Sequence, residues 1–87
     1  MNLKELRQAK ADCDALQAKL RDEGRKLLAI ASDKRTEAQA ARLTACEAEL
    51  DAAVTAMAGI TADLARAEKF QADEIAAHGR TTVQSGH

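Results

Sequence analysis

Apolar residues recur at alternating three- and four-residue intervals along most of this chain. A repeat averaging about 3.5 residues is typical of α-helices that pack along a narrow seam. Two such repeats are present, one on each side of a polar stretch at residues 32–35. The first comprises Leu6, Ala9, Cys13, Leu16, Leu20, Leu27 and Ile30, and the second comprises Leu43, Cys46, Leu50, Ala53, Met57, Ile60, Leu64 and Ala67. The pattern predicts an all-α protein made of two long helices.

The polar stretch divides the predicted helices. The first repeat predicts a helix over about residues 3–31, and the second predicts a helix over about 36–78, with a break at about 32–35. Together they form one predicted helical domain over residues 1–78, arranged as a helical hairpin or coiled coil. Because the break contains neither Gly nor Pro, one continuous helix is the alternative to a hairpin.

The second predicted helix has a clear start signal. Thr36 and Gln39 have the spacing of a capping box, in which two side chains satisfy free backbone donors. Glu37 suits the positive end of the same helix. Residues 79–87 have no apolar period, which predicts a flexible tail or linker.

The first predicted seam has one weak point. Glu23 is the only charged residue at a seam position, and Gly24 beside it costs a helix about 1 kcal/mol relative to Ala. Asp22 and Lys26 in the same part of the helix form an acid–base pair with the favourable i,i+4 order, which stabilises the helix there. The seam is therefore expected to be weakest around Glu23.

The composition limits how large a core this chain can build. Alanine supplies 21 of the 87 residues, whereas Leu, Ile, Val and Phe together supply 15. Because an alanine side chain buries little area, the chain cannot make a thick core alone. This excludes a β-sandwich, a doubly wound α/β fold and an ordinary enzyme. It favours thin helical seams that other copies of the chain complete.

A hairpin would leave part of the second helix uncovered. If the chain turns tightly near residue 33, residue i lies opposite residue 67 − i, so the first helix covers the second only to about residue 64. The last 14 or so residues then project roughly 20 Å. Phe70 and Ile75 lie on that projection and need another chain to cover them. The predicted self-association seam comprises Leu6, Cys13, Leu16, Leu20, Leu27, Ile30, Leu43, Cys46, Leu50, Met57, Ile60, Leu64, Phe70 and Ile75.

Charge is distributed unevenly between the two halves. The net charge is −1, but residues 1–35 carry nine basic and six acidic side chains, whereas residues 36–78 carry three basic and eight acidic ones. Opposite charge favours pairing of the two helices, within one chain or between chains. The alternative is a chance imbalance on solvated faces. The overall balance does not favour nucleic-acid binding, and no apolar run approaches the roughly 20 residues of a membrane span.

The sequence has no recognisable catalytic or metal-binding pattern. Cys13 and Cys46 lie on the seams, where a thiol acts as a small hydrophobe, and the hairpin register places them roughly 12 Å apart, too far for a disulfide. His78 suits a helix C-terminus, and no ligand spacing joins the histidines to the cysteines. We therefore expect no catalytic residues, no cofactor, no metal and no enzyme activity.

Four stretches of the chain carry a family resemblance. They are MNLKELR at 1–7, EGRKL at 23–27, EAELDAA at 47–53 and ITADLARAEKF at 60–70, with Leu43 after the polar break. In order and spacing they resemble the N-terminal region of tailed-phage major capsid proteins of the Hong Kong 97 type. The chain departs from the common pattern in its few acids near the start of the second helix and in Cys46 and Gly59.

The resemblance implies a function in assembly. In that family the corresponding segment is the delta, or scaffolding, domain, which precedes the shell domain, lies inside the procapsid, guides assembly and is commonly removed by a maturation protease. The implied partners are other copies of the chain and that protease, in a virion or procapsid made in a bacterial cytoplasm. The alternatives are a stand-alone coiled-coil oligomerisation or accessory protein, and a nucleic-acid regulator acting through the first helix.

Overall fold

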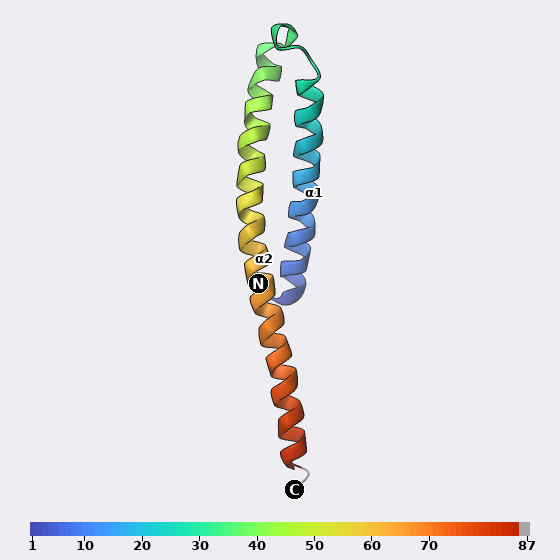
Figure 1. Ribbon diagram of the computed structural model, residues 1–87, viewed down its shortest axis with the longest axis vertical. Coiled ribbons are helices and arrows are strands. Elements are labelled where there is room, and N and C mark those ends of the chain that lie inside the picture. Colours follow the sequence, from blue (N-terminus) through green and yellow to red (C-terminus); the bar gives the residue numbers. More distant parts are fainter. Residues whose placement is uncertain (86–87) are drawn as a thin grey trace.

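The chain folds into a helical hairpin (Figure 1). The computed structural model describes the backbone of residues 1–85 and the side chains of residues 1–78. Helix α1 spans Leu3–Leu28, the short 3₁₀ helix η1 spans Ser32–Lys34, and helix α2 spans Glu37–Ser85. The described residues contain no strand. The all-α prediction is confirmed, and the chain reverses direction instead of forming one continuous helix.

Both long helices begin with a capping box. The Thr36 hydroxyl accepts a hydrogen bond from the Gln39 amide at 3.1 Å, and the Gln39 side chain accepts one from the Thr36 amide at 2.9 Å, as the spacing predicts. At the start of α1, Asn2 and Glu5 form a second capping box, with the Glu5 amide donating to Asn2 Oδ1 at 2.8 Å. Each box satisfies backbone donors that lack partners inside the helix.

Helix α1 ends three residues earlier than the predicted boundary at 31. The Ala29 amide donates to the Arg25 carbonyl and the Ile30 amide donates to the Leu27 carbonyl, which closes the last turn. The Arg35 side chain returns across the reversal and donates from Nε to the Leu27 carbonyl at 3.1 Å. This contact needs Arg35 beside the end of α1, so the chain must leave the helix early enough to turn back.

Helix α2 is longer than its predicted range of 36–78. Its 49 residues span about 74 Å at 1.5 Å per residue. The helix continues to Ser85, so its predicted end at 78 is wrong by seven residues. The flexibility expected of residues 79–87 stays a prediction, and 86–87 lie outside the described residues. Each residue added to an existing helix gains a backbone hydrogen bond, and no proline is present to interrupt it.

The two helices pack through one row of side chains from each. On α1, Leu6, Cys13 and Leu20 are buried, and on α2, Cys46 and Ala53 are buried. We call the α1 residues the Leu6 row and the α2 residues the Cys46 row. The Cys13 thiol donates to the Ala53 carbonyl at 3.2 Å. Residue i of α1 therefore lies opposite residue 66 − i of α2, which differs by one residue from the predicted register of 67 − i. The helices therefore meet along a line one side chain wide.

Candidate association surface

Alternate positions of the predicted seam differ in burial. Residues of the Leu6 and Cys46 rows occupy the helix interface, whereas the other seam positions lie along its edges. On α1 these are Leu16 and Glu23, and on α2 they are Leu43, Leu50, Met57 and Leu64, all half-buried except Leu16, which is 46% exposed. Leu27, Ile30 and Ile60 are also half-buried. The hairpin thus fully buries five of the fifteen apolar positions of the two repeats and leaves the other ten half-buried or exposed.

A shallow apolar groove runs along one edge of the helix interface. It has a volume of about 480 Å³, and we name it the Leu28 groove. Leu20 and Gly24 from α1 and Cys46 and Leu50 from α2 line it, together with Leu28, which is 60% exposed. Leu28, with the half-buried Leu50, leaves apolar surface open to a further helix.

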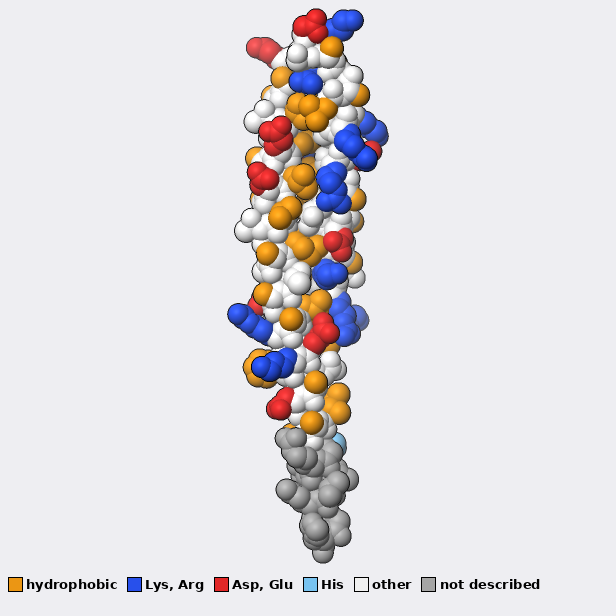
Figure 2. All heavy atoms as spheres, in the orientation of Figure 1, with side chains coloured by type: hydrophobic (Ala, Val, Ile, Leu, Met, Phe, Trp, Pro, Cys, Tyr) orange, Lys and Arg blue, Asp and Glu red, His pale blue; other side chains and the backbone are white. Residues whose placement is uncertain are grey.

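Charged residues line the two rims of the Leu28 groove with opposite signs. Arg21 and Arg25 stand on the α1 rim, and Glu47 stands on the α2 rim. Figure 2 shows the same division near the loop, where Lys and Arg gather over α1, Asp and Glu lie over α2, and hydrophobic side chains run between them. One rim is therefore basic and the other acidic.

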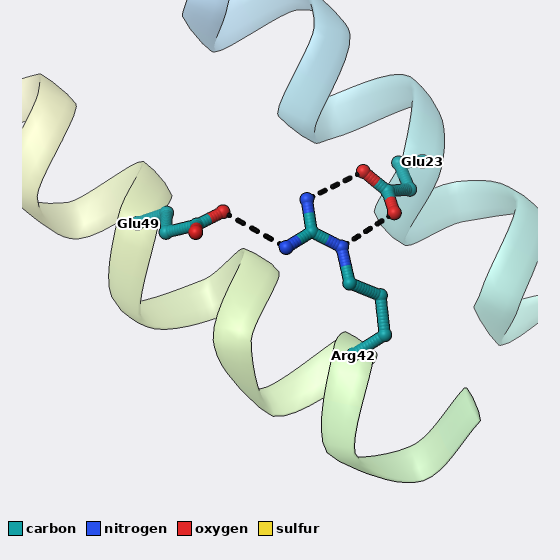
Figure 3. Close-up of polar contacts among 3 residues, drawn as sticks. All are labelled: Glu23, Arg42 and Glu49. Atoms are coloured by element: carbon teal, nitrogen blue, oxygen red, sulfur yellow. Dashed lines mark hydrogen bonds and ion pairs between the residues drawn. The ribbon is translucent and has the colours of Figure 1, made fainter. Parts of the chain in front are cut away.

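A second groove of about 460 Å³ lies on the other side of the Leu20 position, and we name it the Arg42 groove. Its apolar lining consists of three alanines together with Leu16 and the buried Leu20. The Arg42 guanidinium spans this edge of the hairpin, donating to both Glu23 carboxylate oxygens at 2.6 and 2.8 Å. It also contacts Glu49 at 3.3 Å, as Figure 3 shows. This groove therefore already has an ionic network across it.

The network changes the acid–base properties of its members. The hydrogen bonds from Arg42 lower the pKa of the Glu23 carboxyl below its ordinary value. The same contact raises the pKa of the Arg42 guanidinium, so the pair is fully ionised near neutral pH. Burial raises the pKa of the nearby Cys46 thiol, which favours the neutral form that suits an apolar interface. The arrangement holds two helices together and presents no activated nucleophile.

The lower part of α2 has no helix beside it (Figure 1). By the observed register, α1 begins opposite about residue 63, so α2 projects beyond that point. Phe70 is 71% exposed and Ile75 is 67% exposed on this projection. The sequence-based expectation that these two side chains lie uncovered is confirmed within a single chain.

Cys13 and Cys46 are both free and buried. Among the described residues, no group of three or more His, Cys, Asp and Glu side chains could hold a metal ion. No helix in the same part of the chain combines the length and apolar character needed to cross a membrane. The surface features that stand out are the two grooves and the projecting helix.

Sequence reasoning missed two residues that shape this surface. Arg42 was not recognised as the partner of Glu23, although Glu23 occupies a seam position, Arg42 adjoins the seam residue Leu43, and the predicted hairpin register places residue 44 opposite Glu23. Asn2 was not recognised as a helix cap, although Asn followed three residues later by Glu5 resembles a capping box. Both signals were present in the spacing.

No protein-family model matches this chain, and no curated protein or solved structure shows significant similarity to it.

Proposed function

We propose that this chain is a structural assembly module, like the scaffolding domain of a tailed-phage major capsid protein, which self-associates through its helices. The observation that carries the proposal is the incomplete burial of the apolar seam. Leu50 and Leu64 are only half-buried within the hairpin, and Phe70 and Ile75 extend beyond it. Large apolar side chains left in rows at a surface are typical of protein–protein contacts.

A thin seam suits a contact that must form and later be released. Each hairpin offers a narrow apolar strip, so one contact between two copies is weak. Many copies held on one growing shell raise the effective concentration of each strip for its neighbours, and weak contacts then add up. In this proposal the hairpins act inside a procapsid and are removed by a maturation protease, after which the shell cannot disassemble by the same route.

Self-association of the 87-residue chain tests the first part of the proposal. We expect sedimentation equilibrium to show an oligomer whose population rises with concentration. Leu64→Asp places a charge on the half-buried seam and should abolish the oligomer. Ala62→Asp adds the same charge two residues away at an exposed position and is the matched control. A wild-type chain that stays monomeric at millimolar concentration would contradict the proposal.

Shell assembly tests the second part. The gene should continue past codon 87 into a region that encodes a capsid shell domain. In that full polypeptide, the double substitution Leu50→Asp and Leu64→Asp should prevent the formation of normal shells seen by electron microscopy. Normal shells from this variant would contradict a scaffolding role. A stop codon directly after codon 87, together with self-association, would instead favour a stand-alone coiled-coil protein.

A further inference from the structure

We infer that the Leu28 groove binds a second copy of the hairpin with both loops at the same end, so that α1 of each copy packs against α2 of the other. This inference rests on the proposed self-association and specifies its surface and orientation. The product is a four-helix bundle in which each copy covers the half-buried edge of its partner. Three observations support it: the charges of the rims, the side-chain gap at Gly24, and the state of the opposite groove.

The rim charges select the orientation. Two identical faces can meet around a two-fold axis that runs either along the helices or across them. An axis across the helices places α1 against α1, so the basic rims with Arg21 and Arg25 would face each other. An axis along the helices places each basic rim against the acidic rim of the other copy, which carries Glu47. Complementary charge favours this second arrangement.

The register places the opposite charges close together. Because Cys13 lies opposite Ala53, Arg21 is level with residue 45 of α2. Rotation about an axis along the helices leaves every residue at the same height, so Arg21 is level with residue 45 of the second copy as well. Glu47 of that copy is two residues further along its helix, which is about 3 Å along the axis. Neither Arg21 nor Glu47 forms an ion pair within the described residues. Both are available for a contact between copies.

Gly24 adds a steric argument. A glycine inside a helix costs about 1 kcal/mol relative to alanine, and a Cβ atom built at Gly24 would meet nothing within 4 Å. The hairpin alone therefore does not require a glycine there. Gly24 lines the Leu28 groove, where the missing side chain leaves room for a side chain from another copy. Small residues at such positions allow two helices to approach closely.

The opposite groove is less suited to a second copy. Arg42 already spans it with two hydrogen bonds to Glu23 and a contact to Glu49. A helix that entered there would have to remove this ionic network from water. Among the described residues no ion pair crosses the Leu28 groove, and its apolar side chains are the larger ones. The second copy is therefore placed in the Leu28 groove.

A pair of glycine substitutions tests the surface. Gly24→Leu fills the groove and should weaken association at least about tenfold, equivalent to about 1.4 kcal/mol. Gly59→Leu is the matched control, because a Cβ atom there also meets nothing within 4 Å but Gly59 does not line the groove. Both changes favour helix formation, so loss of folding does not complicate the comparison. Circular dichroism checks that helicity is retained.

A charge swap tests the orientation. Arg21→Glu and Glu47→Arg should each weaken the dimer about tenfold. Each change places like charges opposite one another, and in a two-fold dimer this repulsive contact occurs two times. The double variant should restore wild-type affinity. Lys19→Glu makes the same change of charge on the Arg42 groove and should have little effect. Spin labels at Asp33→Cys should lie within about 25 Å in the dimer, whereas the opposite orientation separates the loops by about 40 Å.

The outcomes separate this inference from the proposed function. If the wild-type chain associates and Gly24→Leu associates equally well, the groove is not the interface, while self-association stands. If Gly24→Leu blocks association but the charge swap fails and the loop labels lie far apart, the parallel orientation is overturned. If the wild-type chain does not associate at all, both the inference and the proposed function fail.

Discussion

Glu23 and Arg42, 19 residues apart in sequence, form a bidentate ion pair that joins α1 to α2 near the loop of the hairpin. Glu23 is the charged residue in an otherwise apolar seam, and the pair explains how the seam accommodates it. The carboxylate reaches the edge of the interface, where Arg42 offers two parallel donors in the geometry that such pairs prefer. An apparent defect of the sequence is therefore a specific contact between the helices.

A double-mutant cycle should detect this pair. Glu23→Gln and Arg42→Gln should each lower the free energy of unfolding, and their combined effect should be smaller than the sum of the two. Urea denaturation followed by circular dichroism measures all four proteins. Glu49→Gln is the control, because Glu49 makes a single contact with Arg42 at 3.3 Å and should show weaker coupling. Strictly additive effects of Glu23 and Arg42 would show that the pair contributes nothing.

Acidification should destabilise the hairpin. The pKa of Glu23 lies below its ordinary value of 4.5 because of Arg42, and the pKa of Asp22 lies below its ordinary value of 3.8, chiefly because of Lys26. In the unfolded chain these carboxyls bind protons more readily, so the free energy of unfolding rises with pH across this range. Their contribution is complete above about pH 4.5 and is lost as the pH falls toward the folded-state values.

Thermal melts between pH 7 and pH 2.5 measure this effect. The melting temperature should stay nearly constant near pH 7 and should decrease once the pH is lower than about 4.5. The Glu23→Gln variant should start from a lower midpoint and fall less steeply, because it no longer has the carboxyl that titrates against Arg42. Identical pH profiles for the variant and the wild type would contradict the role assigned to Glu23.

The contact between Cys13 and Ala53 should be sensitive to added volume. The Cys13 sulfur lies 3.2 Å from the Ala53 carbonyl oxygen, and the Ala53 side chain is buried. Ala53→Leu should therefore separate the helices and cost about 1–3 kcal/mol of stability. Ala48→Leu is exposed on the same helix and should change stability by less than about 0.5 kcal/mol. Chemical denaturation at a fixed protein concentration makes the comparison, and equal stability of the two variants would contradict the packing described.

Both thiols should be slow to react in the folded protein. Cys13 and Cys46 are free and buried, and burial raises the pKa of Cys46, which reduces the fraction of reactive thiolate. A thiol reagent added at pH 8 should modify them at least about tenfold more slowly than in denaturant, because reaction requires local opening of the helices. Two thiols that react equally fast in native and denaturing conditions would contradict their placement in the interface.

Much of the hairpin could be predicted because its determinants are local or periodic. The spacing of apolar residues predicted both helices, and the capping pair Thr36 and Gln39 predicted where the second begins. The register was within one residue of that observed between Cys13 and Ala53, because a short reversal leaves little freedom in how the helices align. The uncovered positions of Phe70 and Ile75 followed from the unequal lengths of the helices.

Other features depended on contacts that no local pattern describes. The end of α1 at Leu28 depends on how Arg35 returns to the Leu27 carbonyl, and the seam repeat continued past that point to Ile30. Helix α2 extends past its predicted end at 78, because loss of the apolar repeat does not by itself end a helix. A helix needs an apolar face only where it is packed, and among the described residues no helix lies beside α2 beyond about residue 63.

The sequence by itself determined the two helices, their caps and their alignment, since these depend on side-chain spacing and backbone hydrogen bonding within a few turns. Only the tertiary structure decided which seam residues are buried. Two cylinders touch along a line, so one row from each helix, around Leu20 and Cys46, is enclosed. The next rows, around Leu16 and Leu50, remain at the edges. The same geometry brings Arg42 to Glu23 and leaves the Leu28 groove open.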